Sequence, residues 1–234
     1  MKRLYPFDVT NSKLDQDLLK QIIFHEAGHA AAIHLYNKQM QLPPVYFQIS
    51  IHKAKPSNTD LVTDKAPTAD HYISEIEGGC LIQSLPVLLM ESAKYCLPDD
   101  YDTYRTAFEA DMINLLVGPL AEAKHVALRD NECFTKNLTT IHSLQYYGGQ
   151  SDLDKVYEYL EHLISDSKLH EVKLTELFDK AFQFIESPLH WKAIERLAAY
   201  LLDSTKTTVS SEEAMVVLNG DASCSGNSWL KLSV

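Results

Sequence analysis

Residues 12–38, SKLDQDLLKQIIFHEAGHAAAIHLYNK, decide the fold, because they predict one long helix that holds two histidines four positions apart. Ser12 and Asp15 have the three-residue spacing of a capping box, which favours a helix start at this point. A Pro-Pro pair at 43–44 ends the linker that follows. We therefore expect a helix over residues 13–38.

The two histidines, His25 and His29, lie one above the other on the predicted helix, so both imidazoles can reach a single ion. The same stripe holds Leu18, Ile22 and Ile33, which predicts that the histidines face the core. A helix with this spacing can also bury two hydrogen-bonded imidazoles without any metal. The HExxH pattern defines only three positions, so by itself it leaves both interpretations open.

Glu26 flanks the histidine pair without sharing its face, which suits a general base rather than a ligand. A carboxylate there can take a proton from zinc-bound water, whose pKa the metal lowers to about 7. It can then pass that proton to a leaving amine. Gly28 costs about 1 kcal/mol relative to alanine inside a helix. We therefore expect another segment to approach the helix backbone closely at this glycine.

The next part of the chain predicts a small sheet and a second long helix. Residues 45–51, VYFQISI, are rich in β-branched and aromatic side chains and predict a strand. Residues 52–70 predict a loop, and 71–84 predict one or two short strands. A helical pattern then spans 99–129, in which the Gly-Pro pair at 118–119 predicts a kink or a restart.

The last third of the chain predicts four more helices after an irregular stretch at 130–147. Ser151 is expected to open the first of them, with Asp154 at the third position of a capping box. The other three patterns lie at 168–186, at 188–203, and at 210–218 with Ser210 or Ser211 as the cap.

These elements predict one mainly α domain with a small β-sheet, an α+β fold, over residues 1–220. The sheet is expected near 45–85 and a helical C-terminal part at 151–220. Residues 221–234 are rich in Ser, Gly and Asn and predict a flexible tail.

Composition narrows the class of protein. The chain has 234 residues, 45% of them hydrophobic and 23% charged, as in an ordinary globular protein. Its formal charge of −11 opposes binding to nucleic acid or anionic lipid, which requires clustered cations. The longest apolar stretch, at 80–90, is much shorter than the about 20 residues that a membrane span needs. We expect neither a nucleic-acid partner nor insertion into a membrane.

Two further features predict a cytoplasmic location. The basic residues near the N-terminus are not followed by the apolar segment of a secretory signal. The four cysteines form no CxxC pair and predict free thiols in a reducing compartment: Cys80, Cys96, Cys133 and Cys224.

The order of the motifs resembles the peptidase domain of the FtsH family of zinc metalloproteases. HEAGHA at 25–30 is similar to that family's zinc motif, and a strand follows it, as at 45–51. A later family helix carries a glycine and then a small residue followed by glutamate, as in GPLAE at 118–122. A glycine-rich turn into a helix with a ligating aspartate comes next, as in GGQSDL at 148–153. The resemblance spans roughly residues 12–220 and includes the closing helical patterns.

This resemblance implies a zinc ion held by His25, His29 and Asp152, with Glu26 as the general base. On the residues alone, Asp152 is also explained as a helix-start residue, since the helix dipole favours an acid there by about 0.3–1 kcal/mol. Glu122 would accept the second N–H of a zinc-bound histidine, or would be a solvated helix residue. The other eight histidines have no ligand spacing to one another.

The chain also departs from the FtsH pattern. Proteases of that family carry a membrane anchor and an AAA ATPase module, and we expect neither here. The apolar stretch at 80–90 is too short for the anchor, and the GxxxxGK motif of the ATPase does not occur. The arginine that commonly follows the family's glycine pair is replaced by Pro119 and Leu120.

The expected function is therefore a zinc metallopeptidase that cleaves unfolded or flexible peptides without ATP. The alternative is a catalytically weak protein of the same fold that acts as a binding or regulatory partner, or that works with a separate ATPase. A homo-oligomer is compatible with either, but the family's hexameric ring is not implied.

Overall fold

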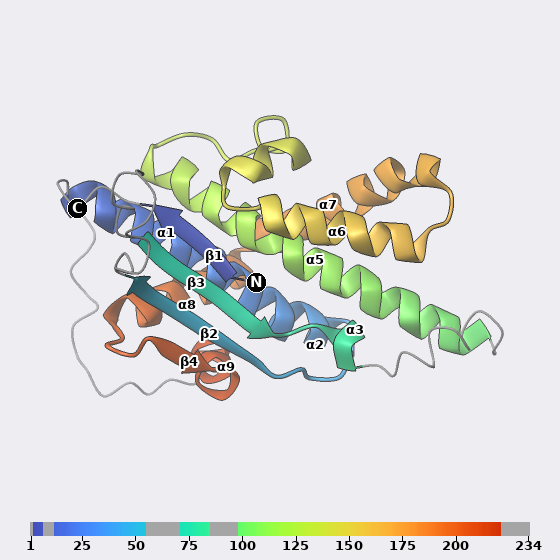
Figure 1. The fold of residues 1–234 in the computed structure, drawn as a ribbon, viewed down its shortest axis with the longest axis horizontal. Coiled ribbons are helices and arrows are strands. Elements are labelled where there is room, and N and C mark those ends of the chain that lie inside the picture. The colour runs from blue at the N-terminus through green and yellow to red at the C-terminus, as the bar shows by residue number, and fades with distance from the viewer. Residues whose placement is uncertain (1, 7–11, 55–70, 85–97, 221–234) are drawn as a thin grey trace, which may run out of the picture.

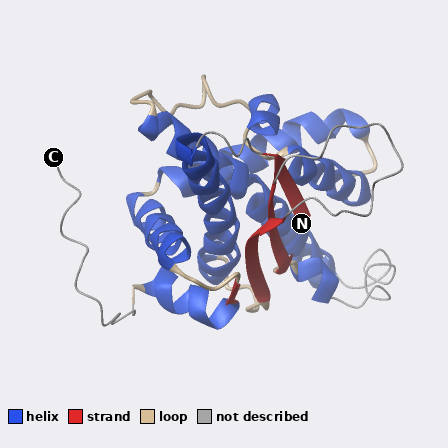
Figure 2. Ribbon diagram, turned by 60° about the vertical axis from the view of Figure 1, so that its left-hand side comes forward, coloured by secondary structure: helices blue, strands red, loops and turns tan. Residues whose placement is uncertain are grey.

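A computed structural model of the protein describes residues 2–6, 12–54, 71–84 and 98–220 (Figure 1). As predicted, the fold is mainly helical with a small antiparallel sheet. Figure 2 shows the strands as a small layer beside the helices, which make up most of the molecule.

The motif helix forms as predicted, with one irregularity. Helix α1 runs over Ser12–Ala31 and continues through a π-helical turn, η1, at Ala32–Tyr36 and a last short turn, α2, at Asn37–Gln39. The π-helical turn was not predicted, because its hydrogen-bond pattern leaves no mark on the apolar spacing. Turns of this kind occur frequently near functional sites, and this one begins three residues after His29.

The second long helix, α5, spans Pro98–Arg129 and contains Pro119 without interruption. The predicted restart at this proline is therefore wrong. A proline inside a helix costs about 3 kcal/mol, but Val117, Leu120 and Ala121 around it are fully buried. We attribute the continuity to this packing, chiefly against α1, which outweighs the loss of one backbone hydrogen bond.

The sheet has the strand order β1-β3-β2-β4 and is antiparallel throughout. Its strands are β1 at Lys2–Pro6, β2 at Phe47–Ala54, β3 at His71–Gly78 and β4 at Thr208–Ser210. β1 and β4 were not predicted, since each is short and forms only by pairing with a longer strand. Both β2 and β3 contact α1, which lies behind the sheet in Figure 1.

One prediction around the sheet needs correction. Residues 52–54, predicted as loop, extend β2, where their backbone pairs with β3. The rest of that predicted loop, 55–70, lies outside the described residues. The stretch 71–84 holds one strand, within the predicted one or two, and Gly78 and Gly79, both with φ near +78°, end it before a short helix, α3, at Leu81–Ser84.

The C-terminal helices cover the core, and their ranges are close to the predicted ones. They are α6 at Gln150–Leu163, α7 at His170–Glu186, α8 at Pro188–Asp203 and α9 at Ser211–Asn219. Ser210 caps α9 by accepting a hydrogen bond from the N–H of Glu213, as one of the two predicted caps. The predicted irregular stretch 130–147 includes a 3-10 helix, η2, at Ile141–Tyr146, and another, η3, at Ser167–Leu169 precedes α7. The predicted tail, 221–234, lies outside the described residues.

None of the helices in the described part of the chain combines the length and the apolar character that a membrane span requires.

Candidate metal centre

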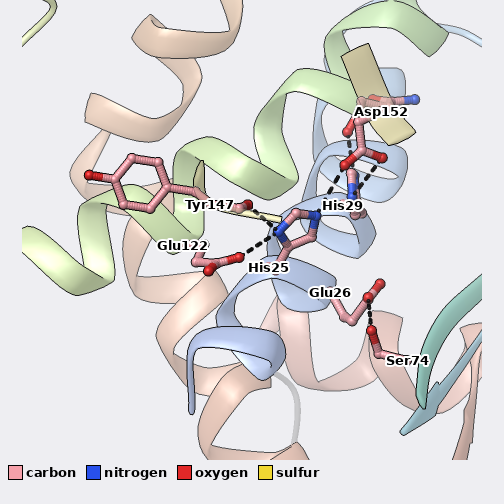
Figure 3. Close-up of polar contacts among 8 residues, drawn as sticks. His25, Glu26, His29, Ser74, Glu122, Tyr147 and Asp152 are labelled. Carbon is pink, nitrogen blue, oxygen red and sulfur yellow. Dashed lines mark hydrogen bonds and ion pairs between the residues drawn. The ribbon is translucent and has the colours of Figure 1, made fainter. Parts of the chain in front are cut away.

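Three predicted ligands from two distant helices meet in the core. His25 and His29 come from α1, and Asp152 comes from the first turn of α6 (Figure 3). The Nε2 atom of His25 lies 3.2 Å from Oδ2 of Asp152, and Nε2 of His29 lies 3.5 Å from Oδ1. One donor atom from each residue can be chosen so that all lie within 4.8 Å of one another. All three side chains are buried, as the helical stripe predicted for the histidines.

The hydrogen bonds of the second ring nitrogens define which tautomers the histidines take. Nδ1 of His29 lies 2.8 Å from the backbone oxygen of Asn114, an atom that can only accept. Nδ1 of His25 lies 2.8 Å from Oε2 of Glu122 and 3.1 Å from the backbone oxygen of Tyr147. The proton of each neutral ring therefore sits on Nδ1, and Nε2 presents a lone pair.

This donor set fits a zinc ion. Two imidazole nitrogens and a carboxylate converge on one buried point, and with the ring protons on Nδ1 all three can ligate one cation. Imidazole and carboxylate ligands suit zinc among the common ions, and the Nδ1 acceptors orient the rings as ligating histidines usually require.

Glu122, which the sequence left open, contacts His25 directly. It is buried on α5, so the alternative of a solvated helix residue is wrong. Pro119, three residues before Glu122, does not disturb this contact, because the helix continues through the proline.

Two glycines allow α1 and α5 to approach closely at the site. A Cβ atom on Gly28 would lie 2.6 Å from Cβ of Ala121 and 2.9 Å from the backbone oxygen of Val117, which confirms the close approach predicted there. A Cβ atom on Gly118 would lie 2.2 Å from Nε2 of His29. A side chain at position 118 would therefore occupy the space of the His29 imidazole.

The turn before α6 positions Asp152. Gly149, not Ser151, is the N-cap of α6, and no side chain caps this end, so the predicted capping box is wrong. Asp154 instead accepts a hydrogen bond of 2.8 Å from Nε2 of Gln150. A Cβ atom on Gly149 would lie 2.7 Å from Pro119, so a glycine lets the turn pack on α5 and bring Asp152 to the histidines.

The candidate base, Glu26, has a partner that the sequence did not reveal. The hydroxyl of Ser74 donates a hydrogen bond of 2.7 Å to Oε1 of Glu26, and both side chains are fully buried (Figure 3). Ser74 lies in β3 between Tyr72 and Ile76, which are buried on the same face. A serine in an apolar row of a strand was the one available signal, since a buried hydroxyl needs a partner.

The metal centre opens into a cleft of about 480 Å³. Glu26, His29 and Asp152 lie in its wall, together with the end of β3 and the facing turns of α5 and α6. Zinc in this position would therefore be accessible to a ligand in the cleft, while its protein ligands stay buried.

Burial of the Asp111 carboxyl in the cleft wall should make the stability of the protein depend on pH. Desolvation raises the pKa of its carboxyl to about 6 from the usual 3.8, although the N–H groups of Leu81 and Ile82 donate to it and act in the opposite direction. A raised folded-state pKa contributes stability that is complete below the unfolded pKa and is lost as the pH rises through the folded one. From about pH 4 to about pH 7, we expect wild type to lose roughly 2 kcal/mol of unfolding free energy relative to Asp111→Asn. Urea denaturation of both proteins across this range measures the difference, and a constant difference would contradict the prediction.

Comparison of the chain with models of known protein families, with curated proteins and with solved structures finds no match.

Proposed function

We propose that this protein is a zinc-dependent metallopeptidase, similar to the FtsH peptidase domain, that hydrolyses unfolded or flexible polypeptides and needs no ATP for the chemistry. One observation carries the proposal. Two histidine Nε2 atoms and the Asp152 carboxylate converge beside a buried glutamate, at a cleft large enough for a peptide segment. The order of HEAGHA and GGQSDL along the chain supports the same conclusion.

Each residue of the site has a definite role in this proposal. His25, His29 and Asp152 hold the zinc ion, and Glu122 and the backbone oxygen of Asn114 keep the imidazoles oriented. Bound zinc would polarise the scissile carbonyl and lower the pKa of a water molecule. Glu26 takes a proton on its carboxylate and returns it to the nitrogen of the leaving amine.

The chain's other properties agree with a cytoplasmic enzyme. The absence of CxxC spacing supports free thiols in a reducing compartment, and Cys80 and Cys133 are free cysteines among the described residues. The acidic charge supports a polypeptide rather than a nucleic acid as the partner. Delivery of folded substrates would require an ATPase, and these 234 residues contain no P-loop motif.

The direct test combines metal analysis with a cleavage assay. We expect about one zinc ion per chain in the purified protein, casein cleavage without ATP, and loss of cleavage when a chelator removes the metal. Readdition of zinc should restore the activity. Stoichiometric zinc without cleavage of casein or of a broad peptide library would favour the binding-protein alternative. No affinity for zinc would contradict the proposed site itself.

Replacing Ser74 by alanine tests how far the base depends on its partner. A hydrogen bond to a charged group contributes about 1.5–3 kcal/mol. Its loss should lower kcat by about 10- to 100-fold, while KM and zinc content stay near the wild-type values. Ser50→Ala in the neighbouring strand is the matched control, because Ser50 bonds only weakly to Thr208, at 3.4 Å. Equal kcat values for the two variants would show that Ser74 does not position Glu26.

A further inference from the structure

The metal cleft lies along one particular edge of β3. The opposite edge is paired with β2 over the whole strand, from Phe47↔Gly78 to Ala54↔His71. From the sheet, the cleft wall takes residues 75–78 at the end of β3, and 79–80 just after it, but no described residue of β2. The cleft therefore opens on the side of β3 that faces away from β2.

The N-terminal strand occupies this same edge. β1 pairs antiparallel with β3 from Lys2↔Glu75 to Pro6↔His71, and Figure 1 shows it between β3 and α5. Its register brings Arg3 opposite Ser74, the residue that donates to Glu26. β1 thus begins opposite Glu75, the first residue of β3 in the cleft wall. From there it runs along the same edge of β3, away from the cleft, to His71.

The pairing identifies which backbone groups hold β1 in place. Ile51 of β2 donates its N–H to the backbone oxygen of Thr207, the residue just before β4, so the alternate residues Ser50 and His52 face β3. The residues of β3 that pair with these residues of β2 point their backbone groups toward β2. The residues between them, Tyr72 and Ser74, point theirs toward β1, where they lie opposite Tyr5 and Arg3. The N–H and C=O groups of Arg3 and Tyr5 therefore form the ladder with β3.

This ladder is short and chemically unselective. β1 has five residues, against eight in β2, and only Arg3 and Tyr5 direct their backbone groups to β3. The groups that hold it are backbone amides, which any extended polypeptide also presents. One strand edge accepts one partner, so β1 and a second strand cannot pair with residues 71–75 of β3 at the same time.

We propose that the β1-facing edge of β3 is a docking surface for an extended segment of unfolded polypeptide. In the free protein β1 occupies this edge, and the bound polypeptide displaces β1 from it. The inference rests on the proposed function, because it takes a polypeptide as the substrate. A short peptide fits beside the end of β3 in the cleft without disturbing β1. A long chain that passes the metal centre continues along residues 71–75 and has to replace β1 there. β1 therefore selects against long substrates until it is released.

A proline at Arg3 tests this inference, because it removes one ladder N–H from β1. Arg3→Ala is the matched control, since it loses the same side chain and keeps the N–H. Both changes are made in a Glu26→Gln background, so that binding is measured without hydrolysis. We expect Arg3→Pro to bind fluorescent unfolded casein about tenfold more tightly than Arg3→Ala, while the affinity for a six-residue peptide is equal in both. Equal casein affinity in two folded variants would overturn the proposal.

Amide hydrogen exchange followed by NMR gives a second readout that needs no substitution in β1. When casein is added to the Glu26→Gln protein, we expect the amides of Arg3 and Tyr5 to lose protection while those of Tyr72 and Ser74 keep it, since a new strand takes the place of β1. Continued protection of Arg3 and Tyr5 with casein bound would overturn the proposal. Neither readout depends on cleavage. Exchange of β1 for casein in the Glu26→Gln protein, together with no hydrolysis of casein by the zinc-loaded wild type, would refute the proposed peptidase activity and leave the docking surface in place.

Discussion

Replacing Glu26 by glutamine is expected to lower peptide hydrolysis by about 10³-fold, while zinc binding stays at the wild-type level. Glutamine has nearly the same shape, and its Oε1 atom can still accept the hydrogen bond that Ser74 donates to Glu26. It cannot accept the proton that the reaction has to move. The effect should therefore fall on kcat, with little change in KM.

The measurement is kcat/KM on a fluorogenic peptide, with the zinc content of the same samples determined by elemental analysis. Zinc analysis is the internal control, because Glu26 flanks the ligands without belonging to the set that converges on the metal position. Wild-type activity in a zinc-loaded Glu26→Gln protein would show that another group moves the proton.

Removing the Asp152 carboxylate is the second change with a large expected effect. Asp152→Ala leaves two imidazoles without the anion that lies 3.2 Å and 3.5 Å from their Nε2 atoms. Loss of a group that only supports a ligand typically lowers metal affinity by about 10- to 100-fold. Loss of a ligand itself should exceed about 100-fold, and hydrolysis should disappear at stoichiometric zinc.

Asp154→Ala is the matched control, because Asp154 is an exposed aspartate in the same helix start and bonds to Gln150 rather than to the histidines. Competition with a chromophoric chelator measures the zinc affinity of both variants. If both bound zinc equally tightly, Asp152 would be only the helix-start residue that its sequence position also allows.

Local sequence accounted for the helices and for the face that carries the histidines. The periodicity around His25 and His29 predicted a buried pair on one long helix, and both are buried on α1. Gly28 predicted a close approach of another segment, which α5 supplies. The restart predicted at Pro119 failed because tertiary packing outweighed a local backbone preference. Pro119 favours a break, but burial of its neighbours keeps α5 continuous.

Asp152 lies between what local sequence predicts and what only the tertiary structure shows. Its residue type and its place after a glycine-rich turn explain a helix start, and only the resemblance to the FtsH motif order assigned it to the metal. The structure places it beside both histidines, as that assignment requires. No local pattern contains this proximity, since 127 residues separate Asp152 from His25.

The sequence by itself determined that α1 presents two imidazoles and a flanking carboxylate, because an interval of four residues is sufficient to align side chains on a helix. Only the tertiary structure decided what surrounds them: Glu122 and the Asn114 backbone on the imidazoles, and Ser74 on Glu26. It also decided that β1 lies along the edge of β3 beside the cleft. The physical reason is the range of the interactions. Helical periodicity acts within a few residues, whereas these contacts form only when packing, permitted by the glycines at the α1–α5 interface, brings distant segments together.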